Sequence, residues 1–155
     1  MSLFNWGKKP HTITDDVFGL LKYCEHEDAS TNCFEGRGMF VQGKDGPAAP
    51  VEYLVYAAKA GPTPEQRSFY LDLQTHFDYY IARMIPMIEK EFVAWGKPIQ
   101  VLDFKNEFSV FALSIFRSNG TPIKWEITLD TIHDTNHQVI IDFAGDEPCD
   151  ILIDV

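Results

Sequence analysis

The chain has 155 residues, a formal net charge of −10 and 45% hydrophobic residues, including 12 Phe, 6 Tyr and 3 Trp. This length fits a single globular domain, and the hydrophobic content excludes a disordered chain. No run approaches the roughly 18 apolar residues of a transmembrane helix, and residues 1–16 lack the apolar stretch of a secretory signal. We therefore predict a cytoplasmic protein that makes no membrane contact.

The acidic residues are concentrated in the last fifth of the sequence. Residues 125–155 contain eight acids and no Lys or Arg, whereas the other residues contain 15 acids and 13 bases. The eight acids are Glu126, Asp130, Asp134, Asp142, Asp146, Glu147, Asp150 and Asp154. Such a negative field disfavours nucleic acid and anionic membrane, and favours a basic protein or a cation. Solubility alone is the simpler interpretation.

The three cysteines, Cys24, Cys33 and Cys149, are odd in number and widely spaced. Neither a disulfide framework nor a zinc site is expected from this pattern, which is typical of a protein in a reducing compartment. Cys24 lies two residues from His26, but no third group of a nucleophilic site accompanies this pair.

The first half of the chain predicts three strands. Residues 1–14 are expected to form a loosely held N-terminal arm, and residues 15–155 a single domain. Strands are predicted at residues 17–24, 34–41 and 51–58. Gly36 and Gly38 interrupt the second strand, which predicts a bulge or a close approach of another group to the backbone.

A strong helix signal follows the third strand. Thr63 can cap the helix, Pro64 suits its first turn, and Gln66 completes a capping box. Apolar residues then recur at spacings of three and four, which is typical of an amphipathic helix. Pro86 lies within this pattern and is expected to kink the helix or to end it.

Four further strands are predicted at residues 108–116, 123–130, 138–143 and 149–155. Asn119-Gly120 indicates a tight type I′ hairpin between the first two. In the last three, apolar and polar residues alternate, so one face of the sheet should be buried and the other exposed. The alternation places Cys149 and Ile153 on the inner face and the acids of these strands on the outer face.

The order is therefore strand-strand-strand-helix-strand-strand-strand-strand, and short connections imply antiparallel neighbours. The predicted fold class is α+β: an antiparallel sheet of about seven strands packed against one long, Pro-kinked helix.

One polar loop resembles a metal site in its residue types. Residues 130–137 read DTIHDTNH, and His133, Asp134 and His137 are ligands that a divalent transition metal accepts. A solvated loop is the simpler interpretation, because no Glu completes an H-E-x-x-H motif. The common nucleotide-binding and hydrolase motifs are absent, so neither a catalytic residue nor a cofactor is predicted.

Short motifs resemble those of bacterial immunity proteins from polymorphic or contact-dependent toxin systems. They are DDVFGLLKY at the opening, GPTPEQ at the helix start, and the closing strands WEITLD and VIIDF. The second strand departs from the resemblance, since it reads CFEGRGMFV where such domains often centre on Trp-Gly. The resemblance implies a cytoplasmic inhibitor of a toxin and no catalytic residues.

We therefore predict a non-enzymatic protein-binding module that occludes a basic toxin domain through an acidic sheet face. The predicted partner-binding residues are Glu126, Asp130, Asp142, Asp146, Asp150 and Asp154. Two alternatives stay open: a small metal-dependent enzyme that uses the loop around His133, and a structural domain that is a homodimer rather than a monomer through pairing of its last strand.

Overall fold

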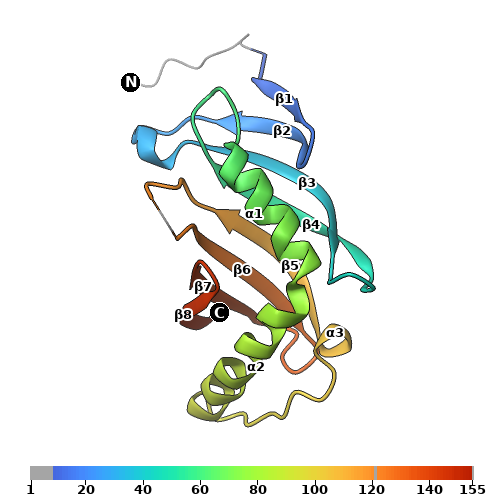
Figure 1. Cartoon of the computed structure of the whole chain (residues 1–155). Coiled ribbons are helices and arrows are strands. Elements are labelled where there is room, and N and C mark those ends of the chain that lie inside the picture. The colour runs from blue at the N-terminus through green and yellow to red at the C-terminus, as the bar shows by residue number, and fades with distance from the viewer. Residues whose placement is uncertain (1–8, 121, 155) are drawn as a thin grey trace.

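The structure is a computed structural model, and it describes residues 9–120 and 122–154. One sheet of eight strands runs in the order β1 to β8, so that neighbours in the chain are neighbours in the sheet (Figure 1). The strands are β1 (Thr12–Asp15), β2 (Gly19–Cys24), β3 (Cys33–Val41), β4 (Ala48–Tyr56), β5 (Phe108–Ile115), β6 (Lys124–Thr131), β7 (Gln138–Ala144) and β8 (Glu147–Asp154). The helices are α1 (Pro64–Thr75), α2 (Phe77–Ala94), α3 (Phe104–Glu107) and the 3-10 helix η1 (Ala29–Thr31).

The sheet is mixed, which corrects the prediction of a purely antiparallel one. All neighbouring strands are antiparallel except β4 and β5, which are parallel. The reason is the connection between them: α1 and α2 carry the chain back across the sheet, so β5 is entered from the same end as β4. Two antiparallel four-strand units, β1–β4 and β5–β8, are thereby joined side by side.

The eighth strand is β1, which the sequence analysis assigns to the N-terminal arm. Thr12 pairs with Lys22 and Asp15 with Gly19, so residues 12–14 belong to the sheet. The DDVFG motif is the turn between β1 and β2, and β2 therefore begins at Gly19 rather than at residue 17. Residues 1–8 of the predicted arm lie outside the described residues.

The predicted long helix is two helices. The capping box is confirmed, because Gln66 N donates to Thr63 Oγ1 at 3.2 Å and Thr63 N to Gln66 Oε1 at 2.9 Å. The break comes at His76, where φ is −106° and ψ is 23°, and not at Pro86. Pro86 lies inside α2, which continues to Ala94.

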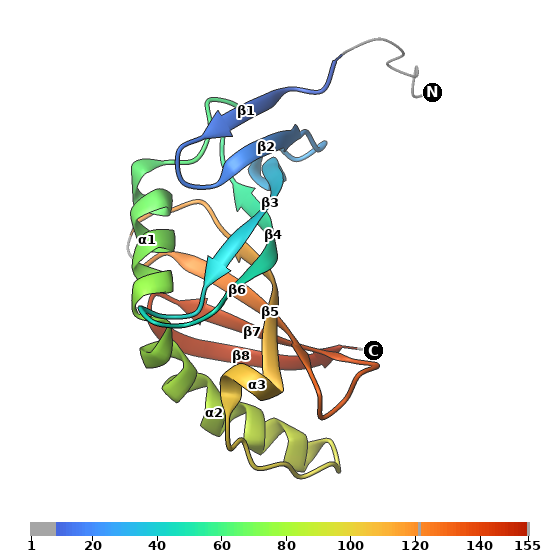
Figure 2. The same ribbon diagram turned by 90° about the vertical axis from the view of Figure 1, so that its right-hand side faces the viewer.

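The core lies between the sheet and the two helices, which cover the same face of it (Figure 2). From the helices, Leu73, Phe77, Met84, Ile88 and Phe92 are fully buried against strand residues such as Phe34, Val55, Ile127 and Ile141. No helix within the described residues is long and apolar enough to cross a membrane.

The two glycines of β3 make room for this core. A Cβ on Gly38 would lie 2.6 Å from Tyr53 Oη, and one on Gly36 would lie 2.5 Å from Leu21 Cδ2. The predicted close approach is thus confirmed, since the side chains of neighbouring strands lie over the glycine backbone.

Candidate binding face of the sheet

The face of the sheet opposite α1 and α2 is called the open face here. No helix covers it in the part of the chain that the structure describes (Figure 2). Alternation along β6 decides which residues reach it: Trp125, Ile127 and Leu129 are buried on the helix side, so Glu126 and Asp130 point to the open face.

Three acids form one row across the open face. Glu126 on β6 is the Cα partner of Asp142 on β7, and Asp142 is the partner of Asp150 on β8. Side chains at directly opposed positions lie about 4.5–5.5 Å apart at their Cβ atoms, and like charges there are destabilising. We call Glu126, Asp142 and Asp150 the acidic row.

The acidic row changes the ionisation of its half-buried member. Burial raises the pKa of Glu126, and the charge of Asp142 and hydrogen bonding with it raise this pKa further. A hydrogen bond with Ser114 acts in the opposite direction and does not cancel these effects. Glu126 therefore binds a proton more readily than an isolated glutamate.

The other half of the open face has balanced charges. Lys22 on β2 is opposite Glu35 on β3, and Arg37 on β3 is opposite Glu52 on β4. Arg37 Nη2 and Glu52 Oε1 form an ion pair at 2.6 Å. Cross-strand pairs of opposite charge stabilise a sheet surface. The like-charge pairs of the acidic row therefore differ from the opposite-charge pairs of β2–β4 in the same sheet.

Each half of the open face is hollowed. One, of about 540 Å³, lies over β2–β5 and is lined by residues of the balanced half, including Lys22, Glu35 and Arg37. The other, of about 430 Å³, lies over β5–β8 and is lined by Glu126 and Asp142 together with Phe116, Lys124 and Cys149, among others. The ring of Phe116, which lines this second hollow, is stacked on that of Tyr56 on β4, with the ring centroids 4.8 Å apart.

Asp130 and Asp154 lie at one end of the open face. Gln138 Nε2 donates to Asp130 Oδ1 at 2.8 Å, and Gln138 is the Cα partner of Asp154. Together with His137 these residues line a third hollow of about 350 Å³. Both aspartates are exposed, so they extend the negative surface beyond the acidic row.

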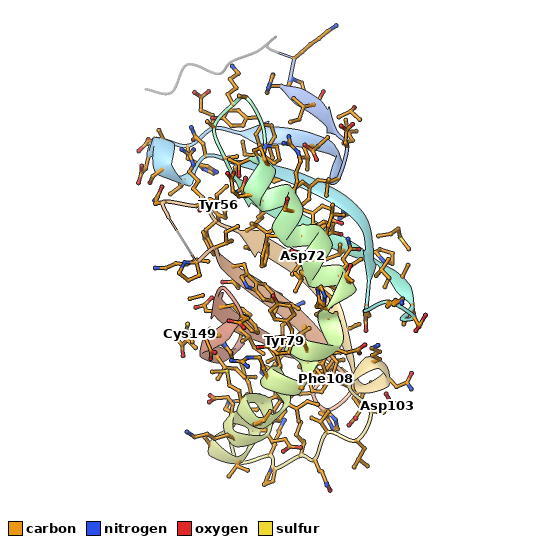
Figure 3. All side chains as sticks on the ribbon, viewed as in Figure 1. Tyr56, Asp72, Tyr79, Asp103, Phe108 and Cys149 are labelled. Atoms are coloured by element: carbon orange, nitrogen blue, oxygen red, sulfur yellow. The ribbon has the colours of Figure 1, made fainter. Side chains whose placement is uncertain are left out.

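Asp146 lies elsewhere, against α2. Its Oδ2 accepts a hydrogen bond from the Oη of Tyr79, a residue labelled in Figure 3, at 2.8 Å. Arg83 donates both to Tyr79 Oη, at 2.9 Å, and to Glu147. The turn between β7 and β8 is thus fastened to the helix. Strand alternation could not indicate this, because Asp146 is in a turn and its partners are more than 60 residues away.

Cys149 is exposed rather than turned inward as predicted (Figure 3). The register of β7 and β8 shifts between Asp142 and Phe143, so that Phe143 is opposite Pro148. An irregularity of this kind inverts the alternation on one side of it. The prediction holds for Ile153, which is buried, and is wrong for Cys149.

The two histidines of the loop make separate contacts with carboxylates. His133 Nε2 lies 2.7 Å from Glu107 Oε1, whereas His137 Nδ1 lies 2.8 Å from Asp134 Oδ1. Lys97 Nζ lies 2.7 Å from Asp134 Oδ2, so an ammonium group stands where a metal would have to bind that carboxylate. Among the described residues no three His, Cys, Asp or Glu side chains are grouped to hold a metal ion.

The partners of Asp134, which are Lys97 and His137, favour its ionised form. Hydrogen bonds from Lys97 and His137 hold the pKa of Asp134 well below its usual range, against the effect of burial. Trp95 completes the contact, because its ring lies 4.6 Å from that of His137 and 5.0 Å from Lys97 Nζ. The loop therefore docks on the C-terminal end of α2 and is not a solvated connection.

Comparison with known proteins adds no relative: no family model, no curated protein and no solved structure matches this chain. What the open face offers a ligand is therefore defined by its own chemistry, which is a hollowed sheet surface with negative charge over β6–β8. Such a surface can bind positively charged groups.

Proposed function

We propose that this chain is a non-enzymatic protein-binding module, an immunity-type protein of the cytoplasm whose open face binds and occludes a basic toxin domain. The acidic row carries the proposal. In the same sheet, β2–β4 match each acid with a base, whereas no base is opposed to Glu126, Asp142 or Asp150: their partners are one another and, for Glu126, Ser114 on β5.

Repulsion within the acidic row favours binding of positive charge. Directly opposed carboxylates destabilise the isolated sheet, and a Lys or Arg side chain placed among them would convert this repulsion into attraction. An individual ion pair at the rim of such an interface contributes about 0.5–1 kcal/mol. A buried, hydrogen-bonded pair costs about 2–5 kcal/mol to break, and Glu126 is the half-buried member of the row.

The open face is large enough for a specific interface. Eight strands give seven spacings of about 4.8 Å, and strands of about seven residues are roughly 23 Å long. The product, on the order of 800 Å², equals the surface that one partner contributes to a standard protein–protein interface. A toxin domain docked there would have its basic cleft covered by the sheet rather than by a loop.

A capture experiment with charge-reversed variants tests this proposal. The immobilised chain is incubated at low salt with lysate of its source organism, and bound proteins are identified by mass spectrometry. Wild type should retain a basic partner, whose affinity is then measured with the purified protein. Asp142→Lys/Asp150→Lys should weaken that affinity about tenfold or more and reduce its dependence on salt.

The matched control is Glu65→Lys/Asp72→Lys, which changes the net charge equally but on the exposed side of α1. It should bind the partner as wild type does. Equal binding by both double variants would show that the open face is not the docking surface. Retention of acidic proteins alone would contradict the basic partner.

A further inference from the structure

Two of the three cysteines are directly opposed in the sheet. Cys24, the last residue of β2, is the Cα partner of Cys33, the first residue of β3. Phe34, next to Cys33, is buried on the helix side, so both thiols lie on the open face. Cys24 is partly exposed and Cys33 is buried.

The register of this pair permits a disulfide. Opposed residues of antiparallel strands have Cα atoms about 4.5 or 5.5 Å apart, depending on the type of pair. Disulfides span Cα separations of about 4.4–6.8 Å, so both values are suitable. Burial and the charge of Glu35 raise the pKa of Cys33, and hydrogen bonding with Cys24 acts in the opposite direction without cancelling these effects.

We propose that Cys24 and Cys33 are a reversible oxidation site, which closes to an intramolecular disulfide by exchange with a small-molecule disulfide such as oxidised glutathione. Cys149 is exposed on β8, at the opposite end of the sheet, and takes no part.

The exchange takes two steps, the formation of a mixed disulfide and its resolution by the second cysteine. The Cys24 thiolate attacks one sulfur of oxidised glutathione, which forms a mixed disulfide and releases one glutathione thiolate. Cys33 then loses its proton and attacks the sulfur of Cys24, which releases the second glutathione. Two cysteine sulfurs are oxidised, and one small disulfide is reduced to two thiols. His26 Nε2 lies 4.0 Å from Cys33 Sγ and can accept the proton of that thiol.

The surroundings make this exchange slow at neutral pH. Burial raises the pKa of Cys24 to about 11, and Glu35 raises it as well, whereas Lys22 acts in the opposite direction. Because the thiolate is the attacking species, we expect the rate to rise about tenfold per pH unit from neutral to mildly alkaline pH. Tyr56, the Cα partner of Cys33 on β4, also has a raised pKa, so it stays neutral over this range.

The experiment uses the full chain with Cys149→Ser, which removes the exposed thiol. The folded protein is incubated with oxidised glutathione, quenched with acid, unfolded, alkylated and analysed by peptide mass spectrometry. Cys24 and Cys33 should lose their free thiols together, with a mass decrease of two hydrogen atoms and no added glutathione. Dithiothreitol should restore both thiols. A glutathione adduct on Cys24 that persists beside a free Cys33 would overturn the proposal.

Cys33→Ser in the same background is the matched control, because it keeps the attacking thiol and removes the resolving one. Cys24 of this variant should accumulate as the glutathione adduct, at the rate at which the disulfide forms in the parent. Circular dichroism establishes that both proteins stay folded during the reaction. A Cys24 that remains free in both proteins would equally overturn the proposal.

Discussion

Gln66 joins three parts of the chain through one side-chain amide. Its Oε1 accepts from Thr63 N at 2.9 Å, while its Nε2 donates to Tyr56 O at 2.9 Å and to Phe116 O at 3.1 Å. Those carbonyls belong to the last residue of β4 and the residue after β5, the two strands of the parallel pair. The residue that completes the capping box of α1 therefore also holds the two halves of the sheet together at one end.

Replacement of this amide tests its role. Gln66→Glu keeps the acceptor but removes the donor, so two partly buried carbonyls would face a buried carboxylate. We expect the free energy of unfolding to fall by about 2–4 kcal/mol, measured by urea denaturation. The control is Gln74→Glu, because Gln74 uses only its Oε1, which accepts from Val41 N at 2.9 Å. A loss of similar size in both variants would contradict the donor role of Gln66.

At the scale of elements, the local patterns of the sequence were reliable and the long-range ones were not. The capping box at Thr63 and the alternation of β6 depend on neighbouring residues only, and both are confirmed, except that Thr128 on the outer face of β6 is buried. The parallel pairing of β4 with β5 depends instead on the path of α1 and α2, which carry the chain back across the sheet before β5 begins. Asn119-Gly120 does form a connection, but β6 starts only at Lys124, and no described residue other than glycine has positive φ, so the turn is not type I′.

In the candidate site, too, the local features could be predicted from the sequence and the long-range contacts could not. Alternation could predict that Glu126 and Asp142 point outward, but only the register shows that they are opposed. Asp134 and Glu147 belong to the same acidic run, yet they are paired with Lys97 and Arg83 from the helical segment. No periodic pattern in the sequence encodes those contacts, because their partners lie 37 or more residues away.

The docking of the β6–β7 loop predicts a pH dependence. The pKa of Asp134 is lowered by Lys97 and His137, and that of Glu107 by the backbone N–H of Asp103 and by His133. A carboxyl with a lowered pKa in the folded chain stabilises it above the unfolded value, and this contribution is lost as pH falls. Stability should therefore decline below pH 4.5, the ordinary value for glutamate, and further below 3.8, the value for aspartate.

Asp134→Asn is the variant that isolates this contribution. It should be less stable than wild type at pH 7, and the difference should shrink as the pH falls below 3.8, which urea denaturation at several pH values would measure. Asp130→Asn serves as the control, since Asp130 is exposed and accepts one hydrogen bond from Gln138. Parallel pH profiles of wild type and Asp134→Asn would rule out the contribution of this ion pair.

For the whole molecule, β8 is one of the two terminal strands at which a second copy could extend the sheet that the structure describes. Within the described residues β8 is the last strand of the sheet, and its exposed Leu152 lies between Asp150 and Asp154. If two copies paired antiparallel with Leu152 on the symmetry axis, the carboxylates at positions 150 and 154 would oppose each other across the interface. Like charges at opposed positions are destabilising, and edge charges are a common means of preventing such pairing.

We therefore expect a monomer, in contrast to the alternative of a homodimer through the last strand. Light scattering after size exclusion should give 17.7 kDa at both low and high micromolar concentration. Asp150→Asn/Asp154→Asn removes the repulsion and should raise the apparent mass with concentration, because the two positions on either side of Leu152 on the same face are then uncharged. A wild-type mass that itself doubles with concentration would contradict the protective role of these acids, and would make a second copy, rather than a basic partner, the occupant of this part of the sheet.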